Sequence, residues 1–338
     1  MLLIYNPIAG THRGSSTPEE IVAAFKKAGR EVRLAFTAYK GHAHDLAKQA
    51  LADGEKIVLV CGGDGTVNEA ASALIETDVV LGILPNGSGN AVARHLQIPV
   101  NPLKAIDIIR EGSWKAIDWC DANGRPFFAA FGIGFDAAVA KRFSEKKRRG
   151  FRTYIKSAFE VFPSYKAHRY IIRTAEGDIL DTKAMFVTCC NTSQLGNNAY
   201  LAPHASVTDG LMDITVVEKS NIFNYARLGI DLMAGAIHSS LGLKMLRTKA
   251  AHILCLEDST ISTGKESSNT AASTLYPDGE SIGHSDGESV TMEATHFDGE
   301  PAETGREIEV KVHHAGLKVF VNLNWQPIRP WLTPLHIH

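Results

Sequence analysis

The chain has 338 residues, 44% of them hydrophobic, and its 35 Lys and Arg are nearly balanced by 37 Asp and Glu. This length exceeds an ordinary single domain and predicts two. The balanced charge argues against a surface built for nucleic acid, so no nucleic-acid partner is expected.

The first part of the chain alternates between two kinds of segment. Strand-like patterning covers residues 2–5, 31–37, 56–61 and 80–84, and helical patterning lies between these at 19–28, 44–53 and 67–75. This order predicts an α/β domain with a mostly parallel sheet and crossover helices. Ligands of such sheets bind at the carboxyl ends of the strands, where loops 6–10, 62–66 and 85–90 would meet.

Two of these loops are rich in glycine and lead into a helix. The first is Gly62-Gly63-Asp64-Gly65-Thr66, and the second contains Gly87-Ser88-Gly89-Asn90. Glycine permits close backbone approach, and a helix N-terminus presents free N–H groups and partial positive charge. Together the loops predict a phosphate site. Each loop alone is also compatible with a tight turn whose glycines serve packing.

The pattern changes from about residue 114 onward. Strand-like stretches follow one another at 114–120, 126–132, 170–174, 184–190, 212–217, 307–312 and 318–322, which predicts an antiparallel β domain. Helical interruptions are expected at 137–162 and 222–245. Polar residues dominate 259–293 and predict a disordered insertion. We therefore expect a nucleotide-binding domain at 1–122 and a β-rich domain at 123–317.

Several polar groups in the second half have two interpretations. Asp209-Gly210 and Asp298-Gly299-Glu300 place carboxylates on turns, where they suit a cation or a general base, although Asp-Gly is also a common turn dipeptide. The basic cluster at 146–149 precedes aromatic residues and suits either a solvated helix face or an anionic membrane surface. The histidines, His168 among them, lack metal-type spacing and are interpreted as structural or solvated.

The compartment is suggested by features that are missing from the sequence. Its five cysteines are odd in number and lack metal spacing, which favours free thiols in a reducing cytoplasm. The N-terminus has no signal-peptide pattern, and no apolar run approaches the roughly 20 residues that span a bilayer. Any membrane contact is therefore expected to be peripheral, at the inner membrane surface.

These motifs, in this order, resemble the bacterial diacylglycerol kinase-type lipid kinases, relatives of the sphingosine and ceramide kinases. The matching segments include Asn6-Pro7, the Gly62–Thr66 turn with Asn68-Glu69, the Gly87–Asn90 turn, and the turns at Asp209 and Asp298. The first glycine turn alone is shared with NAD kinases. The second glycine turn and the two Asp-Gly turns are more specific.

The resemblance implies an α/β domain of NAD kinase/diacylglycerol kinase type, a β-sandwich-like domain with helices, and the cofactors ATP and Mg²⁺. It also implies that the C-terminal segment, residues 318–332, returns to the first domain. It implies transfer of the γ-phosphate to the hydroxyl of a membrane lipid, with Asp298, Glu300 and Asp64 as catalytic carboxylates. Asp209 and the backbone oxygens of Ser206 and Leu211 are the implied magnesium ligands. The implied nucleotide contacts are Asn6, Thr37, Gly62, Gly63, Asp64, Gly65, Thr66, Val67, Asn68, Glu69, Gly87 and Ser88.

The motifs leave the lipid acceptor, the general base and the assembly open. Many diacylglycerol kinases have Thr at the position of Ser88, and the sequence here looks more like the sphingosine and ceramide kinase branch. The acceptor is therefore diacylglycerol or a sphingoid or ceramide-like lipid. The base is open between Asp298 and another carboxylate. Alternative functions are an NAD kinase and a non-catalytic lipid- or nucleotide-binding protein, and a homodimer is one option for the assembly.

Overall fold

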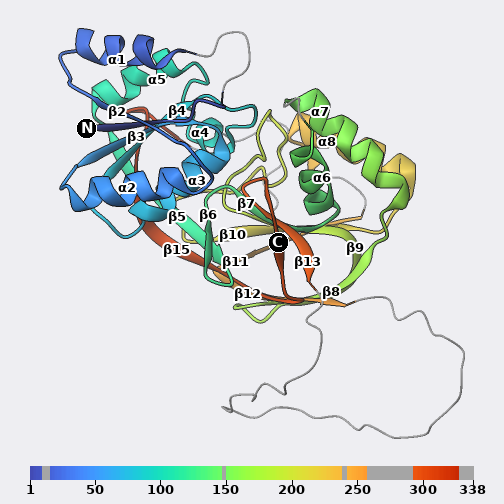
Figure 1. Cartoon of the computed structure of the whole chain (residues 1–338). Helices are drawn as coiled ribbons and strands as arrows, with labels where there is room; N and C mark the ends of the chain where they lie inside the picture. Colours follow the sequence, from blue (N-terminus) through green and yellow to red (C-terminus); the bar gives the residue numbers. More distant parts are fainter. Residues whose placement is uncertain (10–15, 147–149, 238–241, 257–291, 327–338) are drawn as a thin grey trace, which may run out of the picture.

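The computed structural model describes residues 1–9, 16–146, 150–237, 242–256 and 292–326 (Figure 1). Pairing between strands runs without a break from one end of the molecule to the other, in the order β14-β13-β7-β9-β8-β12-β15-β4-β3-β1-β2. Two regions of different character share this path: a parallel region at the β2 end and an antiparallel region at the β14 end.

The parallel region is formed by the first strands of the chain. These are β1 (Leu2–Tyr5), β2 (Arg33–Phe36), β3 (Ile57–Gly62) and β4 (Val80–Pro85), and all their pairings with one another are parallel. Their crossover helices are α1 (Pro18–Lys27), α2 (His42–Ala52) and α3 (Asp64–Leu74), and α4 (Ala91–His95) and α5 (Pro102–Glu111) follow β4. Strands β1, β3 and β4 are buried almost throughout, which explains their continuous apolar runs.

The antiparallel region contains the remaining strands and three helices, which Figure 1 shows gathered at one side of the strands. The helices are α6 (Phe135–Ser144), α7 (Phe151–Val161) and α8 (Ile222–Ala234), with a short 3-10 turn at Phe162–Ser164. The strands are β5 (Trp114–Ala122), β6 (Arg125–Phe127), β7 (Ala130–Gly134), β8 (His168–Thr174), β9 (Ile179–Cys190), β10 (Met212–Glu218), β11 (Leu243–Thr248), β12 (Ala250–Leu256), β13 (Glu293–Phe297) and β14 (Glu300–Thr304).

One long strand, β15 (Glu307–Phe320), joins the two regions. Its first half pairs with β12, and its last part pairs in parallel with β4. It also runs antiparallel to β5, with a register shift between His313 and Leu317 where Ala315 has a positive φ of 57°. The C-terminal strand therefore ties the β-rich region to the edge of the parallel sheet.

The expected fold class, an α/β region followed by a β-sandwich-like region with helices, is confirmed. Several expected boundaries are wrong. Residues 126–132 form two strands, and the expected strands at 307–312 and 318–322 are the two ends of one strand. The helix expected over 137–162 is two helices, and most of the insertion expected at 259–293 lies outside the described residues. All five cysteines are buried and free, as expected.

The helix expected over 222–245 is too long. It ends at Ala234 because Gly235 adopts the left-handed conformation, with φ of 69°, and its N–H bonds back to Asp231 and Leu232 carbonyls. The apolar residues from Leu243 onward belong to β11 instead. Among the described residues, no helix is both long and apolar enough to cross a bilayer.

Candidate active site at the junction of the two regions

The first glycine-rich turn joins β3 to α3 at the carboxyl edge of the parallel sheet. Helix α3 begins at Asp64, earlier than the sequence pattern indicated, so its first N–H groups lie within the turn. The second turn packs against it, because a Cβ on Gly87 would lie 2.5 Å from Gly63 Cα. The two turns therefore touch through their backbones, which only glycine permits.

The Asp64 carboxylate connects these two turns by hydrogen bonds. It accepts hydrogen bonds from the amides of Asn90 (2.7 Å) and Ala91 (2.6 Å), at the start of α4. Burial raises the pKa of Asp64 to about 6, and the nearby Asp298 adds to this effect. Asn90 has a positive φ of 53°, and its side chain bonds both the N–H and the carbonyl of Gly87. These hydrogen bonds join the two glycine turns through Asp64 and Asn90.

Other residues of the expected nucleotide set lie around the first turn. Asn6 Nδ2 donates to Thr66 Oγ1 at 2.8 Å, which links the end of β1 to α3. Thr37 follows β2 at the same edge, where its amide bonds the Tyr5 carbonyl at 3.0 Å. The Val67 side chain belongs to the hydrophobic core, so only its backbone faces the turn.

Glu69 has a local structural role. Its carboxylate oxygens accept hydrogen bonds from the amides of Gly41 (2.8 Å) and Ala43 (3.2 Å), at the beginning of α2. A side chain from α3 thus caps the neighbouring helix, which has no side-chain cap of its own. Contact of Glu69 with a nucleotide stays a prediction.

Asp298 comes from the β13–β14 turn and crosses to the first region. One oxygen accepts from the Ala129 and Ala130 amides at 2.7 and 2.9 Å, and the other accepts from the Phe128 amide at 3.0 Å and Asn68 Nδ2 at 2.7 Å. Burial raises the pKa of Asp298, and these donors oppose the rise. Because a carboxylate has about four acceptor positions, Asp298 is saturated in this arrangement.

Glu300 is the less constrained carboxylate of the same turn. Its Oε1 lies beside the first glycine turn, 3.0 Å from where a Cβ on Gly65 would stand. Its Oε2 pairs with Lys40 Nζ at 3.4 Å, and the Glu300 side chain is 44% exposed. Glu300 therefore brings an accessible carboxylate, and Lys40 a cation, to the start of α3.

The turn expected to bind magnesium lies in the β-rich region, directly before β10. Asp209 is exposed, accepts a hydrogen bond from the Leu211 amide at 3.1 Å, and pairs with the Arg247 guanidinium. Asp213 lies opposite Arg247 in the β10–β11 register, and its buried Oδ2 has no hydrogen-bond partner among the described residues. Burial raises the pKa of Asp213 to about 6. The carboxylates and the unpartnered oxygen fit a divalent cation, with Arg247 as the competing cation.

The sequence interpretation missed several groups at these sites. Lys40 follows β2 at the carboxyl edge of the sheet, a position that a search of all strand ends would have included. Asp118 is fully buried and bonds the Gly210 amide at 2.7 Å and His314 Nδ1 at 2.8 Å. Asp118 thereby supports the Asp209 turn, but its position inside an ordinary strand gave no signal.

Comparison with known proteins agrees with this architecture. Residues 1–122 match the family model described as the diacylglycerol kinase catalytic domain. Residues 129–295 match the model described as the YegS C-terminal NAD kinase beta sandwich-like domain.

Curated relatives cover most of the chain. A diacylglycerol kinase of Mycobacterium tuberculosis is 31% identical over 74% of this chain and 83% of its own length. One from Bacillus subtilis is 29% identical over 69% of this chain and 78% of its own length. The crystal structure of a putative diacylglycerol kinase from Bacillus anthracis has a TM-score of 0.69 at 22% identity, covering 95% of this chain and 96% of that one. That last likeness concerns the fold alone.

Proposed function

This chain belongs to the bacterial diacylglycerol kinase family and is a lipid kinase, and we propose that it transfers the γ-phosphate of ATP to a lipid hydroxyl in a Mg²⁺-dependent reaction. The observation that carries the proposal is the meeting of two turns from different regions. The glycine turn at 62–66 offers helix N–H groups for phosphate, and the turn at 298–300 brings Glu300 beside Gly65.

Phosphate binding is assigned to groups at the carboxyl edge of the sheet. The N-terminus of α3 and the two touching glycine turns would cradle the phosphates, because their backbones leave room for close approach. Lys40 stands beside Gly65 through its ion pair with Glu300 and would add a positive charge for the terminal phosphate. Thr37, Ser88 and Asn6 stand around these turns and complete the proposed nucleotide site.

Proton transfer is assigned to the turn at 298–300. A general base must accept a hydrogen bond from the attacking hydroxyl. The four acceptor positions of Asp298 are taken by backbone amides and Asn68, whereas Glu300 is partly exposed beside the phosphate turn. We therefore propose that Glu300 is the general base that accepts the proton of the lipid hydroxyl, and that Asp298 positions the turn. Asp64 holds the two glycine turns together.

Magnesium is assigned to the Asp209 turn, with Asp209 and the backbone oxygens of Ser206 and Leu211 as its ligands. These are the hard oxygen donors that Mg²⁺ prefers. When bound there, Mg²⁺ would neutralise acidic groups that otherwise depend on Arg247. Within the protein, Asp118 would hold the turn in place through its bond to the Gly210 amide.

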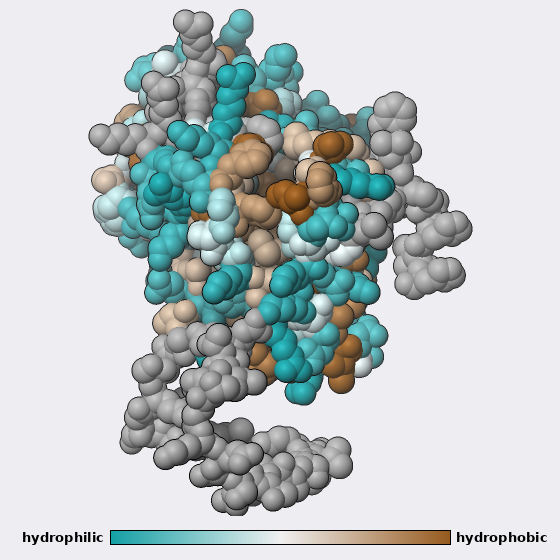
Figure 2. Space-filling view, turned by 90° about the vertical axis from the view of Figure 1, so that its right-hand side faces the viewer, coloured by the Kyte–Doolittle hydropathy of each residue, from teal (hydrophilic) through white to brown (hydrophobic). Residues whose placement is uncertain are grey.

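Access to a lipid is assigned to the exposed faces of α7 and α8. On α7, Arg152, Ile155, Lys156 and Phe159 share one exposed face at helical spacing, and Phe159 is 75% exposed. On α8 the exposed apolar residues are Ile222, Phe223, Ile230 and Met233. Figure 2 turns this side of the molecule to the viewer and shows hydrophobic side chains among polar ones.

This mixture of basic and apolar side chains suits a membrane surface. Apolar residues enter the interface, and basic residues attract anionic headgroups by roughly 1 kcal/mol each. Phe162 at the end of α7 packs edge-on against Tyr225 of α8, with ring centroids 5.5 Å apart, so the two helices form one surface. We propose peripheral contact with the inner membrane surface through this face.

The test is a phosphorylation panel. Purified protein with Mg²⁺ and labelled ATP is given detergent-dispersed diacylglycerol, monoacylglycerol, ceramide and sphingosine in separate reactions, with NAD as a further acceptor. We expect a labelled lipid, diacylglycerol first among them because the relatives are named for it. Labelled NADP without any labelled lipid would contradict the proposal and favour an NAD kinase. Omitting Mg²⁺ must abolish the labelling.

A further inference from the structure

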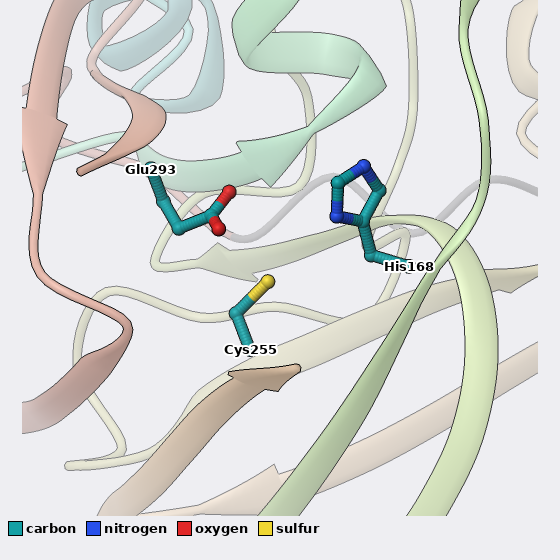
Figure 3. A group of neighbouring side chains, drawn as sticks. All are labelled: His168, Cys255 and Glu293. Carbon is teal, nitrogen blue, oxygen red and sulfur yellow. The ribbon is translucent and has the colours of Figure 1, made fainter. Parts of the chain in front are cut away.

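Three potential metal ligands meet on one face of the β-rich region. They are His168 on β8, Cys255 on β12 and Glu293 at the start of β13, and their ligand atoms all lie within 4.8 Å of one another. Figure 3 shows the three side chains converging from separate strands. None of the three belongs to the active site or to the Asp209 turn.

The sheet register explains why these residues meet. Cys255 lies directly opposite Tyr170 in the antiparallel pairing of β12 with β8, so the two side chains share a face. His168 is two residues before Tyr170 and therefore points to that same face. The Cys255 amide bonds the Arg306 carbonyl at 2.9 Å, and the Arg306 side chain lies 3.7 Å from Glu293, which brings Glu293 to the group.

The donor atoms select a class of metal. An imidazole nitrogen, a thiolate sulfur and a carboxylate oxygen form a mixed set that suits Zn²⁺, whereas Mg²⁺ and Ca²⁺ take oxygen ligands. With Zn–S of roughly 2.3 Å and Zn–N of roughly 2.0 Å, tetrahedral ligand atoms stand roughly 3.5 Å apart. Ligand atoms up to 4.8 Å apart reach this separation when the side chains move by about 1 Å.

A second observation comes from Tyr170. Its side chain is fully buried, and its hydroxyl lies close enough to the Cys255 thiol to oppose the rise in that thiol's pKa. Tyr170 stands on the same sheet face as Cys255 and His168, so a polar group accompanies the proposed ligands on that buried face.

We propose that His168, Cys255 and Glu293 form a zinc site that ties β8, β12 and β13 together. Cys255 and Glu293 are far apart in the sequence, and a metal ion that joins distant residues stabilises a fold by restricting the unfolded chain. Glu293 is also five residues before Asp298, or roughly 17 Å along an extended strand. The site is therefore structural and separate from phosphoryl transfer.

The first test measures zinc affinity by competition with a chromophoric chelator. The full-length protein is expected to bind one Zn²⁺ per chain. The His168→Gln and Glu293→Gln variants are expected to bind at least about 10-fold more weakly, because each loses a ligand. His252→Gln is the matched control. His252 lies on the same strand three residues before Cys255, so its side chain is on the opposite face of β12, and its register partners are Arg173 on β8 and Glu309 on β15. Asp209→Asn must also leave zinc affinity unchanged.

Two further readouts separate this site from adventitious binding. Replacing zinc by Co²⁺ is expected to give a thiolate-to-cobalt absorption band that Cys255→Ser abolishes. Zn²⁺ is expected to raise the melting temperature of the wild type and of His252→Gln, and not that of Glu293→Gln. Equal zinc affinity in the wild type and in His168→Gln and Glu293→Gln, or no zinc uptake by the wild type, would overturn the proposal.

Discussion

Asn68 Nδ2 donates a 2.7 Å hydrogen bond to Asp298 Oδ2, across 230 residues of sequence. The amide belongs to the helix that follows the first glycine turn, and the carboxylate belongs to the turn that carries Glu300. The same Asn68 nitrogen also reaches the Pro126 carbonyl at 3.3 Å. This contact sets where the proposed base stands relative to the proposed phosphate site.

Removal of the Asn68 amide should therefore loosen the junction. Asn68→Ala leaves the partly buried Asp298 with one donor fewer, and we expect the free energy of unfolding to fall by about 1–3 kcal/mol. Urea denaturation measures this loss. Ser72→Ala is the control on the same helix, because Ser72 bonds only the Asn68 carbonyl. Equal stability of the two variants would show that the contact does not matter.

Lys40 should act on nucleotide binding. Its ammonium group is largely exposed and pairs with Glu300 beside the phosphate turn. We expect Lys40→Met to raise the KM for ATP about 10-fold, since one charge-assisted contact is worth about 1.4 kcal/mol or more. Steady-state kinetics at saturating lipid measures the change. Lys48→Met, within α2, serves as the control, and an unchanged KM in Lys40→Met would contradict the assignment.

The contact between the two glycine turns predicts a steric effect. A methyl group on Gly87 would stand 2.5 Å from Gly63 Cα, so the backbone must move. We expect Gly87→Ala to lower the free energy of unfolding by about 1–3 kcal/mol and to reduce the rise in melting temperature that ATP produces.

The matched control for that substitution is Gly229→Ala in α8. Apart from the backbone of its own helix, no described residue has a heavy atom within 4 Å of a Cβ placed on Gly229, and alanine favours a helix by up to about 1 kcal/mol. Gly229→Ala is expected to match or exceed wild-type stability. If Gly87→Ala behaved in the same way, the turns would not be in the contact described.

The raised pKa of Asp64 should make the stability of the fold depend on pH. Its pKa is about 6 in the folded protein, against an ordinary value of 3.8, because burial favours the neutral form. The folded state thus holds this proton more tightly than the unfolded state, and its contribution to stability declines as pH rises from about 4 to about 6. Asp64→Asn removes this decline.

The measurement compares the free energy of unfolding of wild type and Asp64→Asn at a series of pH values. The wild type should lose on the order of 3 kcal/mol relative to the variant between pH 4 and pH 7. Parallel pH curves would show that Asp64 ionises as it does in water. Asp213 has a similarly raised pKa of about 6, but it is present in both proteins and cancels in the difference.

Local patterns predicted much of the fold. The apolar runs of β1, β3 and β4 and the glycine turns were readable because buried parallel strands and phosphate turns have distinctive compositions. Helix α8 was predicted too long because apolar periodicity continues past Gly235, whose left-handed conformation ends the helix. Strand β15 was predicted as two because its register shift at Ala315 and Gly316 looks like a turn in sequence.

Long-range contacts were not readable from the sequence. The four donors to Asp298 come from α3 and from the β6–β7 connection, so nothing local to the Asp-Gly-Glu turn indicates that Asp298 is saturated. The same holds for His168, Cys255 and Glu293, which only the pairing of separate strands brings together. Spacing rules find metal ligands within one motif and miss those assembled by a sheet.

The most direct test of the account is transfer of labelled γ-phosphate to dispersed diacylglycerol by the wild type and two glutamate variants of β14. The wild type should label the lipid, and Glu300→Gln should do so at least about 100-fold more slowly while melting at the wild-type temperature. Glu303→Gln is the matched control, because Glu303 is exposed and pairs with Lys141, away from the glycine turn. Wild-type labelling by Glu300→Gln would contradict the assignment of the base, and absence of any labelled lipid from the wild type would contradict the proposed reaction.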